Sequence, residues 1–245
     1  MDGKVCSKMI PSDLTIAHAL AIGLLFAAWW LYSPLLKLFG RGTLNAQLGV
    51  VRVRWMSLST SRQNRTFDAL LLNQVINSVS FFGSATLIVV AGLFGTFASV
   101  KSVHEVITGL HFFAPMSIGM LAVNLGTVTL VLAISFFSFT YALRKLIYTV
   151  ALTGGLPEQA EQTPAIKAQV AATATVLSEA IRSFNNGIRG YYYAVAALFL
   201  MAGPIACIIA TCLVMAMLFY RQTMTPTARA IAAYVDALEQ ETSAG

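Results

Sequence analysis

Polar and charged side chains gather at two places in this chain, and both groups stand immediately before an apolar stretch. The first group consists of Asn64, Arg65, Asp68, Asn73, Gln74 and Asn77, and the second of Arg182, Asn185, Asn186 and Arg189. Residues three or four positions apart share a helix face, so Arg65 and Asp68 are expected to project together, as are Asn73 and Asn77. Arginines in such a setting bind carboxylates or phosphates through paired N–H donors.

These two groups have two interpretations, and the residue types alone do not choose between them. The side chains can line a basic polar vestibule that attracts an anion or a lipid phosphate. They can also form a network of hydrogen bonds and salt bridges that joins neighbouring helices. We expect the structural network.

Three histidines, His18, His104 and His111, are the candidates for a metal or haem site. His104 and His111 are seven positions apart and can share a helix face. None of the spacings matches a zinc or haem pattern, so we expect no metal and no cofactor. The sequence contains no nucleophile-elbow or P-loop motif, and no carboxylate lies inside its apolar stretches. We therefore expect that the protein is not an enzyme.

The elements that position these residues are long apolar segments. The chain is 57% hydrophobic and 11% charged, and a helix of about 20 apolar residues crosses a bilayer core about 30 Å thick. Segments 14–32, 75–99, 117–143 and 191–220 reach this length without Asp, Glu, Lys or Arg. The sequence predicts an all-α membrane protein with four transmembrane helices, organised as a single membrane domain over residues 1–245. The first apolar run exceeds the about 7–15 residues of a signal peptide, so we expect a retained helix.

Most Lys and Arg residues fall in two connections, 33–74 and 144–190. Positive residues favour the cytoplasmic side, which predicts cytoplasmic connections and both termini outside, most simply in a bacterial inner membrane. The net charge of +6 is explained by basic residues that anchor spans beside anionic headgroups. We therefore expect the lipid bilayer as a partner, and no nucleic acid.

The connections themselves carry helix signals. Thr60-x-x-Gln63 fits a capping box and predicts one helix from about residue 62 to 99, while Thr163-Pro164 supplies a cap and a first-turn proline. Transmembrane helices two and four are thus expected to extend into the cytoplasm. Short amphipathic helices are expected after Ser102 and after Pro226, in the interface or over the outer end of the bundle.

Small residues mark a possible contact between helices. Along the second span they are Ser84, Ala91, Gly95 and Ser99, of which the last three follow at intervals of four that allow close backbone approach. Gly203-Pro204 is expected to kink the fourth span.

Several of these pieces occur in an order that resembles a known family. They are Arg54-Trp55-Met56, Asn64-Arg65 with Asp68, Asn77, Ser80-Phe81-Phe82, the run Phe136–Phe139 before Arg144 and Tyr148, Asn185 to Tyr193, and Gly203-Pro204. Over roughly Leu44 to Tyr220 the chain resembles the bacterial and plant membrane proteins grouped as domain of unknown function 599. The resemblance implies a four-span membrane protein without an established activity.

From the residues we expect a non-enzymatic structural or accessory component that forms a homo-oligomer or joins a larger membrane complex. The alternative is an oligomeric channel or carrier with a basic cytoplasmic vestibule.

Overall fold

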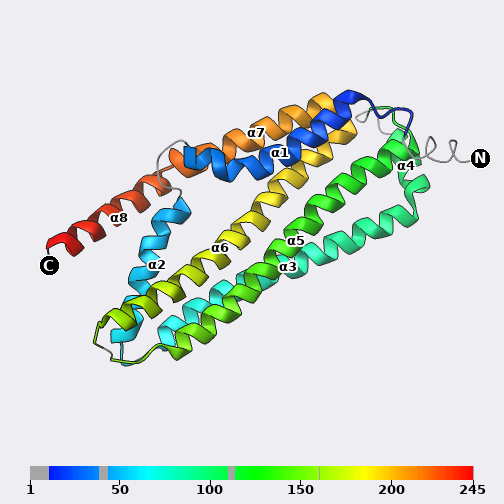
Figure 1. Cartoon of the computed structure of the whole chain (residues 1–245). Coiled ribbons are helices and arrows are strands. Elements are labelled where there is room, and N and C mark those ends of the chain that lie inside the picture. The colour runs from blue at the N-terminus through cyan, green and yellow to red at the C-terminus, as the bar shows by residue number, and fades with distance from the viewer. Residues whose placement is uncertain (1–10, 39–43, 110–113, 160, 245) are drawn as a thin grey trace, which may run out of the picture. The chain divides into compact units, whose positions relative to one another are not determined.

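The computed structural model describes residues 11–38, 44–109, 114–159 and 161–244, and in these ranges every regular element is helical (Figure 1). The elements in chain order are α1 (Ile16–Leu38), α2 (Leu44–Ser61), α3 (Thr66–Ala98), α4 (Val100–Thr108), α5 (Ile118–Gly155), α6 (Pro164–Leu198), the 3-10 helix η2 (Phe199–Ala202), α7 (Pro204–Thr223) and α8 (Pro226–Ala244). Four helical stretches are long and apolar enough to cross a membrane: Ile16–Leu36, Thr66–Ala98, Ile118–Gly155 and Pro204–Glu241. The prediction of an all-α membrane protein with four candidate spans is confirmed.

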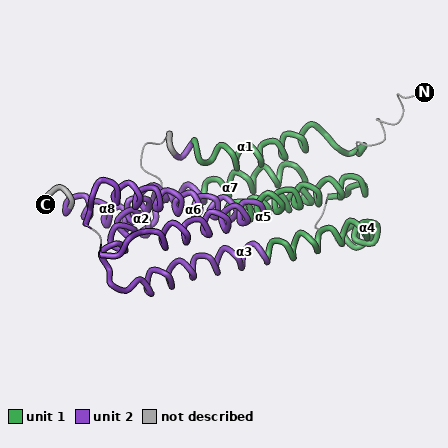
Figure 2. The backbone as a smooth tube through the Cα atoms, turned by 60° about the horizontal axis from the view of Figure 1, so that its bottom comes forward, with its two compact units in different colours: residues 1–34, 85–136, 188–217 green, residues 35–84, 137–187, 218–245 purple. Residues whose placement is uncertain are grey.

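The chain divides into two compact units, coloured separately in Figure 2. Unit 1 comprises residues 1–34, 85–136 and 188–217, and unit 2 comprises residues 35–84, 137–187 and 218–245. Each unit is therefore assembled from three separate stretches of the chain and is described by itself.

The core of unit 1 includes a cluster formed by Leu121, Leu125 and Met201. Helix α4 lays Val103 and Ile107 against this cluster. The amphipathic helix expected after Ser102 therefore exists, although it begins at Val100. Its apolar face covers part of the core.

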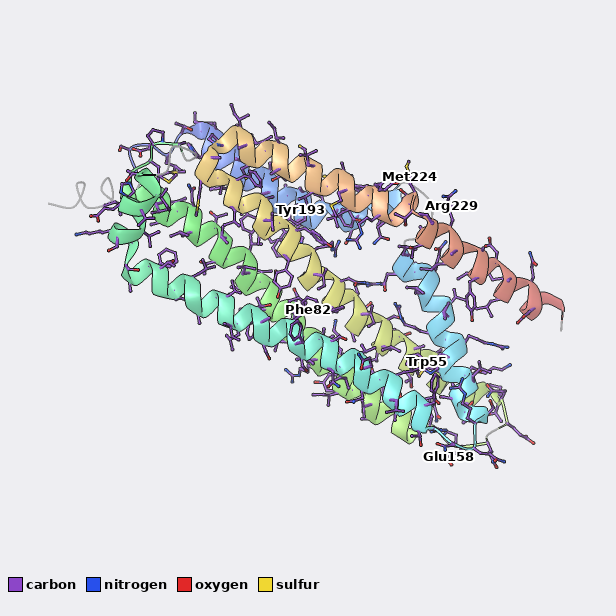
Figure 3. All side chains as sticks on the ribbon, turned by 180° about the vertical axis from the view of Figure 1, so that it is seen from behind. Trp55, Phe82, Glu158, Tyr193, Met224 and Arg229 are labelled. Atoms are coloured by element: carbon purple, nitrogen blue, oxygen red, sulfur yellow. The ribbon has the colours of Figure 1, made fainter. Side chains whose placement is uncertain are left out.

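The core of unit 2 contains three mutually contacting rings from three helices. Phe82 of α3, Phe139 of α5 and Phe184 of α6 have ring centroids 5.7 to 5.9 Å apart, and Figure 3 labels Phe82. Gly187 lies against Phe139 so closely that a Cβ there would meet the ring at 2.5 Å. The glycine is required by this close approach of α6 to α5.

The segment 191–220, expected as one kinked span, is instead divided between two helices. It contains the end of α6, all of η2 and most of α7. Gly203 has φ 118° and ψ 166°, a conformation open essentially only to glycine, and Pro204 is the first residue of α7, where its missing N–H is harmless. Figure 1 shows α7 turning back from the end of α6. The hydropathy pattern could not reveal this reversal, because both arms are apolar.

Hydrogen bonds from α5 and from the residues that precede it hold this turn in place. The buried Asn124 donates its amide to the Leu200 carbonyl at 3.3 Å, and the Ala114 N–H donates to the Met201 carbonyl at 3.2 Å. Two carbonyls of η2, which follows α6, thus gain donors.

The start signals of the extended helices were partly correct. Thr163 caps α6, because its hydroxyl accepts the Ile166 N–H at 3.3 Å. The capping box at Thr60 is wrong, since α2 continues through Ser61 and the Asn64 side chain accepts the Thr66 N–H at 2.8 Å where α3 begins.

The C-terminal helix lies elsewhere than expected. Helix α8 packs against α2 in unit 2, and the Leu44 N–H donates to the Gln222 side chain at 3.2 Å. Helix α8 therefore lies beside the 33–74 connection, whereas the sequence predicts that the C-terminus is outside and that this connection is in the cytoplasm.

Candidate functional site

Asp68 is the most deeply buried charge of the first polar group. Its side chain is 1% exposed, and its Oδ1 accepts the Trp55 indole N–H at 2.7 Å and the Arg62 guanidinium. The predicted pair with Arg65 is not formed. Asp68 instead joins α2, the loop after it and the first turn of α3.

Arg65 binds backbone carbonyls rather than an acid. Its guanidinium donates to the carbonyls of Ser59 at 3.1 Å and Leu156 at 2.7 Å, and to those of Thr153 and Pro157. Cations are favourable at the C-terminal end of a helix, and these carbonyls lie at the ends of α2 and α5. Arg65 thus ties three segments of unit 2 together.

The second polar group is spread along α6. Arg182 is 61% exposed and pairs with Glu179 at 2.6 Å, whereas Asn186 donates to the Ser138 hydroxyl of α5 at 3.0 Å. Asn185 is exposed. These side chains lie three and four positions apart on one side of α6, yet each has a different environment.

Arg189 lies in unit 1, where it meets α1. Its guanidinium donates to the Ser33 hydroxyl at 2.7 Å and stands over the Tyr32 ring, 5.0 Å from the centroid. One turn further along α6, Tyr193 stacks on Trp29 with ring centroids 6.1 Å apart. Charge and aromatic rings therefore form one cluster between α6 and α1.

The predicted site residues are not gathered in one place. Asn64 caps α3, and Asn73 and Asn77 are exposed on it. Arg65 and Asp68 use their polar atoms within unit 2, while Arg189 belongs to unit 1. The described residues thus contain several local polar contacts where the sequence led us to expect one network formed by the two groups.

Sequence reasoning missed Arg52, a buried arginine in α2. Its guanidinium donates to the Asn45 side chain at 2.9 Å, to the Asn45 carbonyl at 3.3 Å and to the Ser178 hydroxyl at 3.2 Å. Burial lowers the pKa of this guanidinium. An arginine in a weakly amphipathic helix gives no sequence signal of burial, so only the packing of α2 identifies it.

The small residues that were expected to form a helix contact face outward, three of them in α3 and Ser99 directly after it. Ser84, Ala91, Gly95 and Ser99 are all exposed, and a Cβ added at Gly95 would meet no atom within 4 Å. Their predicted contact therefore has no counterpart among the described residues of the chain.

The histidines that the structure describes have local partners. The His18 ring lies 2.8 Å from the Thr15 hydroxyl, and His104 lies 2.7 Å from the Met116 carbonyl. His111 lies outside the described residues. Among the described residues no group of three His, Cys, Asp or Glu side chains is arranged to hold a metal.

Comparison with known proteins gives one match, a family model described as "Protein of unknown function, DUF599", over residues 19–227. Curated proteins and solved structures gave no match. The matched range runs from the first turn of α1 into α8 and contains every polar contact described above except that of the Thr15 hydroxyl with His18. The resemblance carried by the motifs between Leu44 and Tyr220 is confirmed over a longer range, and the chain belongs to the DUF599 family.

Proposed function

We propose that the protein is a non-enzymatic membrane component that associates with a second copy of itself through α3. The observation that carries the proposal is the outward stripe of Ala91, Gly95 and Ser99. Only 11% of the apolar window of α3 is buried within the chain, against 56% for α5. Helix α3 is therefore the span that the rest of its own chain covers least.

The composition of this face favours another helix as its neighbour. Helices in a bilayer associate through close packing, for which small residues at four-residue intervals are suited. In a two-fold dimer the same patch meets itself, so the stripe of one α3 can lie against that of the other. The large exposed side chains Ile88 and Phe94 flank the stripe and can pack across such a contact.

The oligomeric state of the purified protein tests this proposal. Native mass measurement in mild detergent should give a dimer, and Gly95→Leu should convert it to monomer because the added side chain separates the backbones. Gly23→Leu is the matched control, since Gly23 is an exposed glycine of α1 that also has no atom within 4 Å of an added Cβ. A monomeric parent protein, or an unchanged dimer in Gly95→Leu, would show that this face contacts lipid.

The same purified sample tests the expectation that no haem is bound. An absorption spectrum without bands beyond those of the aromatic residues is expected. A Soret band would contradict it and would direct attention to His18 and His104.

We further infer an orientation in which the N-terminus is outside and the C-terminus is cytoplasmic, in a bacterial inner membrane. This orientation requires α6 to cross the membrane in addition to the four candidate spans, because four crossings would leave both termini on one side. The contact of α8 with α2 supports it, because the C-terminus then shares a side with the basic connection 33–74. In this orientation all Lys and Arg residues except Lys4, Lys8 and Lys101 lie on the cytoplasmic side or in the helices that lead to it. This distribution agrees with the preference of positive residues for the cytoplasmic side.

Cysteine accessibility tests the orientation. In a background without the native cysteines, Ser243→Cys and Thr163→Cys should both resist an impermeant reagent added to intact cells. Ser102→Cys should react. Labelling of the Ser243→Cys variant from outside would restore the earlier expectation of two external termini.

A further inference from the structure

We propose that an exposed face of α5 binds the phosphate group of an anionic phospholipid, with Arg144 and Tyr148 as its hydrogen-bond donors. Both residues belong to unit 2, and the Arg144 Nε donates to the Tyr148 hydroxyl at 2.8 Å. This inference does not depend on self-association through α3.

Four side chains of this face follow one another along α5 at intervals of four, three and four residues. They are Phe137, Tyr141, Arg144 and Tyr148, and all four are exposed. Residues at this spacing form one row along a helix. Two tyrosines thus flank one arginine on a surface that the rest of the described chain leaves open.

The charge of Arg144 has no carboxylate partner among the described residues. The neighbouring Lys145 approaches Glu179 to 3.9 Å, and Arg182 binds the same carboxylate. Within the described ranges, the hydrogen-bond partner of Arg144 is the Tyr148 hydroxyl and no other group. A negative group from outside the chain can therefore supply the counter-charge that Arg144 lacks.

The bond between these two side chains leaves three donors available. It uses the Arg144 Nε, so the terminal nitrogens Nη1 and Nη2 have no acceptor in the part of the chain that the structure describes. The Tyr148 hydroxyl accepts this bond and keeps its own O–H as a donor. Arginine binds phosphate through two parallel N–H donors. A phosphate group has enough oxygens to accept the tyrosine O–H as well.

The position of Arg144 along α5 favours a lipid as the source of the phosphate. Segment 117–143 contains no Asp, Glu, Lys or Arg, so Arg144 is the first charged residue after the apolar run. This run exceeds the about 20 residues that cross the hydrocarbon core, which places Arg144 at the level of the headgroups. Tyrosine is enriched at that level. The exposed Phe137, two turns nearer the middle of the run, can contact the acyl chain of the same lipid.

Ligand-induced stabilisation of the full chain tests the site. The protein is purified in a phosphate-free detergent, and its thermal midpoint is followed with added phosphatidylglycerol, diacylglycerol or inorganic phosphate. Phosphatidylglycerol should raise the midpoint saturably, because it binds the folded state. Diacylglycerol, which lacks the phosphate, should not raise it. Inorganic phosphate should neither raise the midpoint nor compete with the lipid.

Three variants assign the effect to this face, and a fourth is the control. Arg144→Gln should weaken phosphatidylglycerol binding about tenfold or more, because charge-assisted hydrogen bonds are lost. Arg144→Lys should weaken it several-fold, since lysine keeps the charge but lacks the planar pair of donors. Tyr148→Phe should also weaken it several-fold, because one donor is removed. Arg182→Gln, at an exposed arginine that already has a carboxylate partner, should bind like the parent protein.

Both Arg144 and Tyr148 are exposed, so the variants should fold, and ligand-free midpoints close to that of the parent protein check this. The proposal is overturned if phosphatidylglycerol stabilises the parent protein no more than diacylglycerol does. Parent affinity in Arg144→Lys would overturn it too, because attraction by charge alone would then explain the binding. Parent affinity in Tyr148→Phe, or competition by inorganic phosphate, would likewise contradict the assignment of this face to a lipid headgroup.

Discussion

Replacing Gly190 by alanine should destabilise the protein, because three side-chain atoms of α5 and α1 occupy the space that the new methyl group needs. A Cβ at this position would overlap the Ser135 hydroxyl oxygen and would lie 3.0 Å from Trp29 Cζ2 and 3.1 Å from Ser135 Cβ. Trp29 is 1% exposed and Ser135 is 0% exposed. Neither side chain has open space into which it can move.

The magnitude follows from two opposing terms. Overpacking a close-packed core costs about 1–3 kcal/mol, whereas alanine in a helix interior is favoured over glycine by about 0.5–1 kcal/mol. Gly126→Ala is the matched control, since Gly126 is in the interior of α5 in the same unit and an added Cβ there meets no atom within 4 Å. The propensity term is common to both variants, so their difference in unfolding free energy isolates the steric term of about 1–3 kcal/mol.

Titration with a denaturing detergent, followed by the loss of helical circular dichroism, measures these free energies. The double variant Gly190→Ala with Ser135→Ala should recover about 1 kcal/mol relative to additive behaviour, because the overlapping oxygen is gone and contacting residues couple by this amount. The reasoning is refuted if Gly190→Ala is as stable as Gly126→Ala. It is equally refuted if the serine change gives no recovery.

Three other changes have defined outcomes. Asp68→Asn should lower the unfolding free energy by about 1–3 kcal/mol because it removes a buried counter-charge. The control Glu179→Gln, which breaks an exposed ion pair, should cost under about 1 kcal/mol. Equal losses in the same detergent titration would argue against a structural role for the buried carboxylate. Gly203→Ala should cost about 1–3 kcal/mol through backbone strain, and a midpoint matching the parent would mean that the turn relaxes to another conformation. Hydrogen bonds from the Ser12 hydroxyl and from the Ser117 N–H and hydroxyl lower the pKa of Asp13 below its ordinary value of 3.8. The stabilisation that the ionised Asp13 gives the folded state is thus complete above pH 3.8 and is lost as the pH falls toward the lower folded-state pKa. Asp13→Asn should therefore reduce the loss of melting temperature at acid pH. An unchanged loss would exclude this contribution.

The features that sequence reasoning predicted correctly depend on neighbouring residues alone. Apolar runs of bilayer length identify spans whatever surrounds them, and the cap at Thr163 requires only the turn that follows it. The start of α3 shows the limit of such reasoning, because two residues four positions apart, Thr60 and Asn64, can each cap a helix. Asn64 is used, and Thr60 remains inside α2.

The features it missed depend on contacts between distant segments. The partner of Asp68 was sought at Arg65 by helical spacing, yet Arg62 lies before the helix and Trp55 comes from α2. The reversal at Gly203 had a local signal in Gly-Pro, but that dipeptide does not distinguish a kink inside one span from a turn between two helices.

The contact of Leu44 with Gln222 also has a consequence for how the protein is made. The two residues are 178 positions apart, and at 5–20 residues per second of synthesis on the order of ten to forty seconds separate their appearance. During this interval α2 has been synthesised but α8, which later packs against it, has not. The three stretches of unit 2 are all present only after α8 has been translated. Contacts of such long sequence separation slow folding. The face of α2 that contacts α8 in the mature protein is therefore uncovered until the end of translation. A factor that binds this face would act on the nascent chain and not on the mature protein.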